Sequence, residues 1–155
     1  MTWFRVAEAA RLLGVSDDTL RRWVDRGRLP ARRDDAGRLV IGGADLAALA
    51  QARSGGAGQP PGRGTGRPAG RPAERDVPRE VVVGASARNR LRGIVTRVVR
   101  DGVMAQVELQ AGPYRLVSLM SREAADELGL QPGVVAVAAV KATNVVVEIP
   151  GRAPA

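Results

Sequence analysis

The sequence predicts an α+β protein of two small domains joined by a disordered linker. Residues 1–53 carry apolar residues at helical spacing, whereas residues 86–150 carry short apolar-rich runs typical of strands, one of which, at 104–110, alternates apolar and polar residues as a half-buried strand does. Between them, at 54–85, glycine and proline are so frequent (7 and 5 of the first 25 residues) that no apolar period survives. A tail at 151–155 follows the second domain.

Two short helices and a tight turn are expected first. Apolar residues on one stripe predict a helix over 6–13, which Gly14 follows. Ser16 is suited to cap a second helix over 17–26, which has two aspartates in its first turn and Gly27 at its end. Two helices joined by a glycine-containing turn are the helix-turn-helix pattern.

A β-hairpin with three arginines is expected next, in the place of a wing. Arg32 and Arg33 precede a turn at 34–37, after which the chain returns as a strand over 38–41. A final short helix is expected over 44–51.

The segment VAEAARLLGVSDDTLRRWVDRGRLP, with the wing and helix after it, resembles the small winged helix-turn-helix of excisionase and MerR-type proteins. The resemblance implies double-stranded DNA as a partner, with the second helix in the major groove and the wing against flanking phosphate or the minor groove. The plainer alternative is a solvated basic face on a protein-binding domain. The residues that the resemblance places at or near DNA are Ser16, Thr19, Arg21, Arg22, Arg32, Arg33 and Arg38.

Five strands and one short helix are expected in the last domain. Ser121 is suited to cap a helix that runs to Leu128, with Gly129 as its stop. The helix falls between the third and fourth strands, which is the order of an OB-like five-stranded β-barrel. The expected strands cover 91–100, 104–110, 114–120, 134–140 and 145–149.

Two fragments of this domain carry donors suited to a small oxyanion. Ser86-Ala87-Arg88-Asn89 puts a hydroxyl, a guanidinium and a carboxamide within four residues. Lys141, in Lys141-Ala142-Thr143, is the single lysine beside 23 arginines, which indicates a place that favours a compact ammonium. The alternatives are chance for the lone lysine and a surface charge pair for Arg88 and Lys141 together.

The pieces SARNRLRGIV, DGVMAQVEL, SREAADELGLQPG and VKATNVVV follow one another within residues 86–150 and resemble a Mop (molbindin, TOBE-type) domain. The resemblance implies molybdate or tungstate as the bound ligand, with no organic cofactor and no side chain as a direct metal ligand. It also implies a homo-oligomer, dimer or hexamer, that is held through this domain and has its anion sites at subunit interfaces. The residues that it assigns to the site are Ser86, Ala87, Arg88, Asn89, Ser118, Ser121, Lys141 and Ala142. A satisfied barrel hydroxyl is the alternative for Ser118, and a helix cap alone for Ser121.

Composition narrows the possible functions. The chain has no Cys and no His, which excludes disulfides and cysteine nucleophiles and removes the commonest general base, so an enzyme is not expected. A net charge of +8 suits a polyanion such as DNA; codon bias is the alternative explanation of an arginine-rich composition. No apolar run approaches the ~18 residues of a membrane span and no signal-peptide pattern is present, so a cytoplasmic protein without a membrane partner is expected.

Together these features predict a DNA-binding transcriptional regulator that senses molybdate or tungstate through residues 86–150. The alternative is a molybdate storage or homeostasis protein whose first domain binds DNA weakly or docks a partner. The linker contains Gly-Arg-Pro twice, and such segments enter A·T minor grooves in some proteins, although a plain tether is the simpler interpretation; Val81-Val82-Val83 after it suggests a short edge strand. Through a tether, coupling is expected to act by oligomerisation or effective concentration rather than as a rigid lever.

Overall fold

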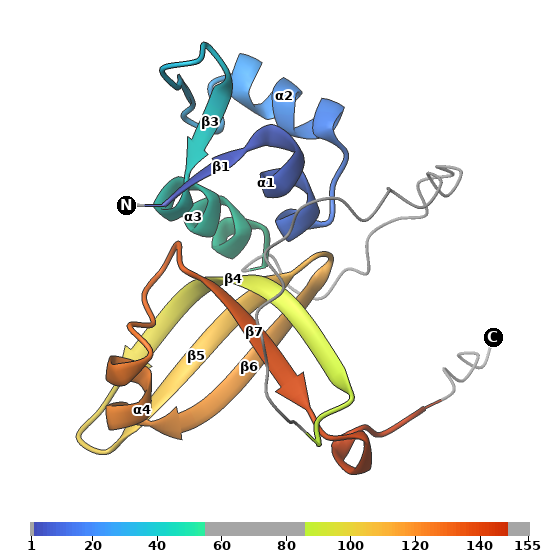
Figure 1. Ribbon diagram of the computed structural model, residues 1–155, viewed down its shortest axis with the longest axis vertical. Coiled ribbons are helices and arrows are strands. Elements are labelled where there is room, and N and C mark those ends of the chain that lie inside the picture. Colours follow the sequence, from blue (N-terminus) through green and yellow to red (C-terminus); the bar gives the residue numbers. More distant parts are fainter. Residues whose placement is uncertain (1, 55–85, 149–155) are drawn as a thin grey trace, which may run out of the picture.

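A computed structural model of the chain describes residues 2–54 and 86–148. Figure 1 shows a helical domain with a small sheet above a curled antiparallel sheet, which confirms the predicted α+β, two-domain architecture. Nearly all of the expected linker, including the suggested strand at 81–83 and the Gly-Arg-Pro repeats, lies outside the described residues, as do Ile149 and the tail.

The N-terminal domain combines three helices with a three-stranded antiparallel sheet in the order β1-β3-β2. Its elements are β1 (Trp3–Arg5), α1 (Val6–Leu13), α2 (Asp17–Asp25), β2 (Arg32–Arg33), β3 (Leu39–Gly42) and α3 (Gly43–Ser54).

The two helices of the helix-turn-helix begin and end at the predicted signals. Gly14 closes α1 in the left-handed conformation, with φ +66°. The Ser16 hydroxyl accepts a hydrogen bond from the Thr19 amide at 3.2 Å and so caps α2. Leu20 on α2 is fully buried in the domain core, while the charged face of the helix stays exposed. The local signals of capping and periodicity therefore determine this part of the fold.

β1 is not predicted from the sequence, because three residues are too few to show a period. β1 pairs antiparallel with β3, and Phe4 lies opposite Ile41. Both side chains are buried, with relative exposures of 2% and 0%. The strand forms because β3, far along the chain, offers it an edge and an apolar face to cover.

The C-terminal domain is a four-stranded antiparallel sheet in the order β6-β5-β4-β7, with one short helix. Its elements are β4 (Asn89–Arg100), β5 (Met104–Ala111), β6 (Tyr114–Ser121), α4 (Arg122–Glu127), β7 (Val135–Val140) and the 3₁₀ turn η1 (Ala142–Asn144).

β4 bends and curls the sheet into a half-barrel. Its first half pairs with β7 and its second half with β5, where the register shifts between Val95 and Arg97 as in a β-bulge. At Gly93 a Cβ atom would lie 2.6 Å from the carbonyl oxygen of Gln110, so the close approach of the two backbones requires glycine there. The bulge and the glycine together give β4 the curvature that encloses an apolar interior.

The fifth strand expected over 145–149 is not formed within the described residues. Residues 145–148 have no strand assignment, and Val146 and Val147 are 80% and 87% exposed. The turn η1 directs this segment away from the sheet (Figure 1). A valine run has the propensity for a strand, but it forms a ladder only where an open edge lies beside it. The edges of β6 and β7 therefore stay unjoined by any strand in the part of the chain that the structure describes.

The two domains pack against each other, which differs from the expectation that a tether alone connects them. The Gly112 amide donates a hydrogen bond to the Leu12 carbonyl across the boundary at 3.0 Å. Ile94 of β4 belongs to the same buried cluster as Phe4 and Leu46 of the first domain. Contacts between residues so far apart in sequence leave no local pattern, so they are not predictable from the sequence.

Candidate nucleic-acid interface and candidate oxyanion site

The N-terminus of α2 uses two of the residues expected at DNA to define the helix itself. Besides capping through the Thr19 amide, the Ser16 hydroxyl lies 2.9 Å from the Thr19 hydroxyl. Arg21 and Arg22 are exposed one turn further along α2, and Arg22 Nε makes only a long 3.4 Å hydrogen bond to the Asp18 carbonyl. The two arginines are therefore available to a partner, whereas the two hydroxyls already satisfy each other.

The three arginines of the wing are exposed, yet each has an intramolecular partner. The Arg32 guanidinium stacks 3.7 Å from the centre of the Trp3 ring. Arg33 Nη1 donates to the Gly37 carbonyl at 2.7 Å, and Arg38 Nε pairs with Asp34 Oδ2 at 2.9 Å. These contacts orient the guanidinium groups before any ligand arrives, which reduces the side-chain entropy that binding would otherwise cost.

A cleft of about 550 Å³ lies between α2 and the wing, and its charged lining is mostly basic. Arg5 is the lining arginine that the sequence does not single out for DNA; it belongs to β1, a strand that the sequence also does not predict. The fold brings together the end of β1, α2 and the wing, so that four arginines and two aspartates line one cleft. The charged lining residues are Arg5, Arg21, Arg33, Arg38, Asp17 and Asp25.

Asp34 organises the turn of the wing. Its Oδ1 accepts hydrogen bonds from the amides of Ala36 and Arg38 at 3.0 and 2.8 Å. The backbone hydrogen bond from Arg38 is the largest cause that lowers the pKa of the Asp34 carboxyl below its ordinary value of 3.8.

We expect the order of the wing to depend on this carboxylate. Because its folded pKa is lowered, its stabilising contribution is present above the ordinary value of 3.8 and is lost as the pH falls through the folded pKa. A carboxyl titration followed by NMR should give Asp34 a midpoint below 3.8, with the Arg38 amide signal changing in the same step. Asp34→Asn should abolish that step, and a midpoint at or above 3.8 would contradict the assignment.

In the second domain, the fold brings the two donor-bearing fragments together at one corner of the sheet. Asn89, which begins β4, pairs with Val140, which ends β7, and its side-chain amide donates to the Val140 carbonyl at 3.2 Å. The chain therefore enters this corner through Ser86-Ala87-Arg88, just before β4, and leaves the same corner through Lys141-Ala142, just after β7. Apart from the half-buried Ala87, these residues are all exposed.

The two serines assigned to the site lie elsewhere in the single chain. Ser118 pairs with Val107, and it lines an apolar groove of about 280 Å³ that runs along the open seam between β6 and β7 as far as Val140. Ser121 pairs with Met104 at the far end of the sheet, beside α4. Six of the eight assigned residues therefore lie at one corner of the sheet within a single chain. Ser118 lies on the other side of the seam, and Ser121 lies at the far end of the sheet.

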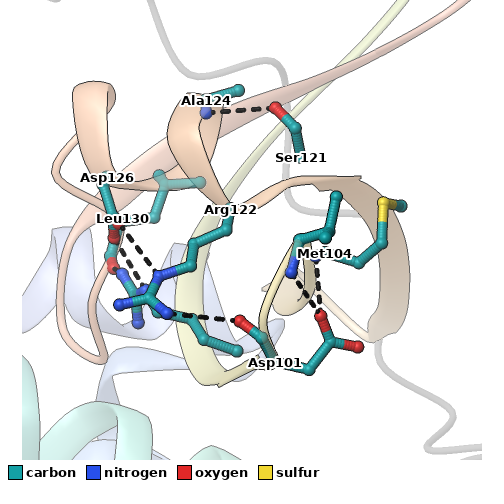
Figure 2. A network of polar contacts seen from close by, with 9 residues as sticks. Asp101, Met104, Ser121, Arg122, Ala124, Asp126 and Leu130 are labelled. Atoms are coloured by element: carbon teal, nitrogen blue, oxygen red, sulfur yellow. Dashed lines mark hydrogen bonds and ion pairs between the residues drawn. The ribbon is translucent and has the colours of Figure 1, made fainter.

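Ser121 has a structural task of its own (Figure 2). Its hydroxyl accepts from the Ala124 amide at 3.2 Å and caps α4. The helix is fixed further by Asp126, which pairs with Arg100 Nε at 2.8 Å and with Arg122 Nε at 3.6 Å. Arg122 also reaches the Asp101 carbonyl at 3.4 Å. The charged side chains at this end of the sheet therefore form hydrogen bonds and ion pairs with one another.

Replacing Ser121 separates the capping role from a role in anion binding. Ser121→Ala should lower the free energy of unfolding by about 0.5–2 kcal/mol, because the Ala124 amide loses its acceptor. Ser121→Asp should retain most of that stability, since aspartate also caps helices, while its charge would repel a nearby anion. Urea unfolding measures the first effect, with Ser118→Ala as the same-strand control. Equal destabilisation by the Ala and Asp variants would contradict the cap.

Two further properties concern only residues 2–54 and 86–148. Within these ranges no cluster of three acidic side chains is placed to hold a metal ion. No helix in them has both the length and the apolar character needed to cross a membrane.

Comparisons with known proteins divide the chain in the same way as the fold does. A helix-turn-helix domain model matches residues 3–54, and a TOBE domain model matches residues 85–147. Both are binding modules rather than catalytic domains.

Curated relatives match the second of these regions. The molybdenum-pterin-binding protein 2 of Clostridium pasteurianum is 38% identical over 63 residues, which are 40% of this chain and 93% of that protein. Molybdenum-pterin-binding protein 1 of the same organism is 35% identical over 63 residues, again 40% of this chain and 93% of that protein. Among solved structures, a molybdate binding protein from Sporomusa ovata is 32% identical with a TM-score of 0.41, over 43% of this chain and 98% of that one. The chain therefore belongs to the TOBE-domain family of the molybdenum-pterin-binding proteins, and it carries a helix-turn-helix domain ahead of that module.

Proposed function

We propose that this chain is a DNA-binding transcriptional regulator that senses molybdate or tungstate. The observation that carries the proposal is the presence, in one chain, of an arginine-lined cleft on a helix-turn-helix domain and a corner of oxyanion donors on a TOBE domain. In this division of labour, residues 1–53 bind DNA and residues 86–150 bind the anion. The protein acts as a binding protein, not an enzyme, in the cytoplasm where its operator lies.

The DNA surface is the face formed by α2 and the wing. Arg21 and Arg22 extend from the exposed side of α2, where the helix enters the major groove, and the wing arginines lie against the flanking phosphates. Arg5 joins this set, because it lines the same cleft as Arg21. Its position suits a phosphate contact, which positions the domain without reading sequence.

The anion site is built around Arg88 and Lys141, whose two charges match a tetrahedral dianion such as molybdate or tungstate. Ser86, Asn89 and the backbone amides near Ala87 and Ala142 supply neutral donors at the same corner. Because Ser118 and Ser121 lie away from this corner in one chain, we assign their contribution to a second copy in a dimer or hexamer formed through the barrel.

Titration calorimetry with molybdate, tungstate and sulfate, together with light scattering, tests the anion function. We expect tight binding of at least one of the first two anions by an oligomer, with weak binding of sulfate. Fluorescence anisotropy with operator DNA, with and without the anion, then tests the regulatory function across a range of salt concentrations. Anion binding without sequence-specific DNA binding would favour the alternative, a storage or homeostasis protein. The absence of heat with every anion would overturn the sensing proposal.

Arg21→Ala should weaken DNA binding and leave anion affinity unchanged. Its guanidinium is exposed on α2 and lines the cleft, so its loss removes about 1–3 kcal/mol if it reads a base. Anisotropy measures the DNA affinity and calorimetry the anion affinity of the same preparation. Arg97→Ala on β4, which removes an equal exposed charge from the barrel rather than from the cleft, is the matched control. An unchanged DNA affinity in Arg21→Ala would remove this residue from the interface.

A further inference from the structure

The barrel presents a docking face to the N-terminal domain. We define it by the β5–β6 hairpin tip Gly112-Pro113, the turn residue Gly133 and the buried Ile94 of β4. Each of these contacts a different part of the N-terminal domain, so the face fixes orientation as well as proximity.

The first contact joins the hairpin tip to the helix-turn-helix turn. The Gly112 amide donates to the Leu12 carbonyl near the end of α1 at 3.0 Å. On Gly14, a Cβ atom would lie 2.5 Å from the backbone nitrogen of Pro113. The two backbones thus approach more closely than any side chain would allow, and the contact includes the turn that sets α2 against α1.

The second contact joins the turn before β7 to the start of α3. A Cβ on Gly43 would lie 2.5 Å from the Gly133 carbonyl oxygen, and a Cβ on Gly133 would lie 2.7 Å from the Ala44 amide nitrogen. Glycine on both sides of one contact permits the direct approach of two backbones. Gly133 also has φ +94°, which favours glycine independently of this contact.

Apolar and polar contacts complete the docking face between these two points. Ile94 has no exposed surface and lies in the core cluster of the N-terminal domain, against which Val135 also packs. At the edges, the Ser54 hydroxyl lies 3.3 Å from Gln110 Oε1, and Arg92 pairs with Glu8 at 3.3 Å. A core shared by both domains resists relative motion more strongly than surface ion pairs do.

The docked arrangement leaves the DNA face free. None of the residues that line the cleft between α2 and the wing belongs to the barrel. Figure 1 shows α2 and the wing turn ahead of β3 at the end of the molecule away from the half-barrel, while β3 itself runs back toward α3. The last turn of α3 connects the two regions, because Arg53 stacks 5.0 Å from the Trp23 ring on α2 and the next residue, Ser54, contacts the barrel.

We propose that the docking face holds the N-terminal domain as a rigid extension of the barrel, so that the barrel sets the direction of the DNA-binding face. The linker then supplies a covalent connection but no coupling. With the proposed function, on which this consequence rests, the distance between paired DNA-binding helices follows from how the barrels assemble. An anion that changes how two barrels assemble would therefore directly change the orientation of their two DNA-binding faces relative to each other.

Distance measurement between two spin labels tests the docking without DNA or anion. The chain has no cysteine, so Asp18→Cys on α2 and Glu123→Cys on α4 give one exposed labelled pair, diluted into an excess of unlabelled chains. A docked domain should give a distance distribution only a few ångströms wide. A random-coil tether with the length of residues 55–85 has an r.m.s. span of roughly 30 Å and should give a broad one.

Two matched pairs of glycine variants locate the effect. Gly43→Ala should broaden the distribution, whereas Gly102→Ala, in open space and likewise without a positive φ, should leave it narrow. Gly133→Ala should broaden it more than Gly129→Ala, which shares the positive φ but meets no neighbour. Circular dichroism of each variant confirms that its domains are folded.

The outcomes of this test and of the proposed function are separable. A broad distance distribution in the labelled protein without any glycine substitution would overturn the docking proposal whether or not the protein binds DNA. A narrow distribution that all four variants leave unchanged would also overturn it, because the glycine contacts would then not hold the domains. A narrow distribution that broadens only with Gly43→Ala and Gly133→Ala would establish it, even if no anion or operator bound.

Discussion

Ile94→Ala is expected to lower the free energy of unfolding by about 2–5 kcal/mol and to destabilise both domains together. Ile94 lies on a strand of the barrel, yet it is completely buried in a cluster formed mainly by the N-terminal domain. Its truncation leaves a cavity at the boundary between the domains. Neither domain can close around this cavity without losing contact with the other domain.

The distribution of aromatic residues makes this effect measurable. Both tryptophans, Trp3 and Trp23, lie in the N-terminal domain, so their fluorescence reports the unfolding of that domain alone. Ile94→Ala should therefore shift the tryptophan transition in urea although the substitution is in β4. Val99→Ala on the same strand, where the side chain is 43% exposed, should shift it little. If the tryptophan transition is unchanged while circular dichroism shows a weakened barrel, the core is not shared.

Arg88→Ala and Lys141→Ala are each expected to weaken molybdate binding by about 1.5–3 kcal/mol, as for the loss of a charge-assisted hydrogen bond. The pairing of Asn89 with Val140 brings these two charges to one corner of the sheet. Lys141→Arg keeps the charge but replaces a compact ammonium with a planar fork, so it should also lose affinity.

Calorimetry of these variants needs a charge-matched control in the other domain. Arg26→Ala removes one exposed positive charge next to α2 and should leave the molybdate affinity unchanged. Loss of affinity in Arg26→Ala equal to that in Arg88→Ala would mean that net charge, not the corner, attracts the anion. Unchanged molybdate affinity in both Arg88→Ala and Lys141→Ala would contradict the assignment of the anion site to this corner.

Local chemistry explains how much of this molecule is predictable from sequence. The cap at Ser16 and the apolar period before Gly14 correctly locate α1 and α2, and the cap at Ser121 locates α4. Short apolar-rich runs bounded by turn residues, with alternation in 104–110, locate β4 to β7 to within a few residues. Each of these signals acts between residues a few positions apart, which is the range that a sequence pattern displays. The wing arginines are likewise found on the surface where the hairpin predicts them.

The division into two domains, the type and order of most elements, and the family of each domain are thus predictable from the sequence. The sequence does not show that Trp3–Arg5 pairs with β3, that Arg5 enters the cleft, or that residues 145–148 stay unpaired. Nor does it show that the Ser86–Asn89 and Lys141 fragments meet while Ser121 lies apart, or that the domains dock through Gly43 and Gly133. These outcomes depend on strand edges and backbone surfaces that are distant in the chain and meet only after folding.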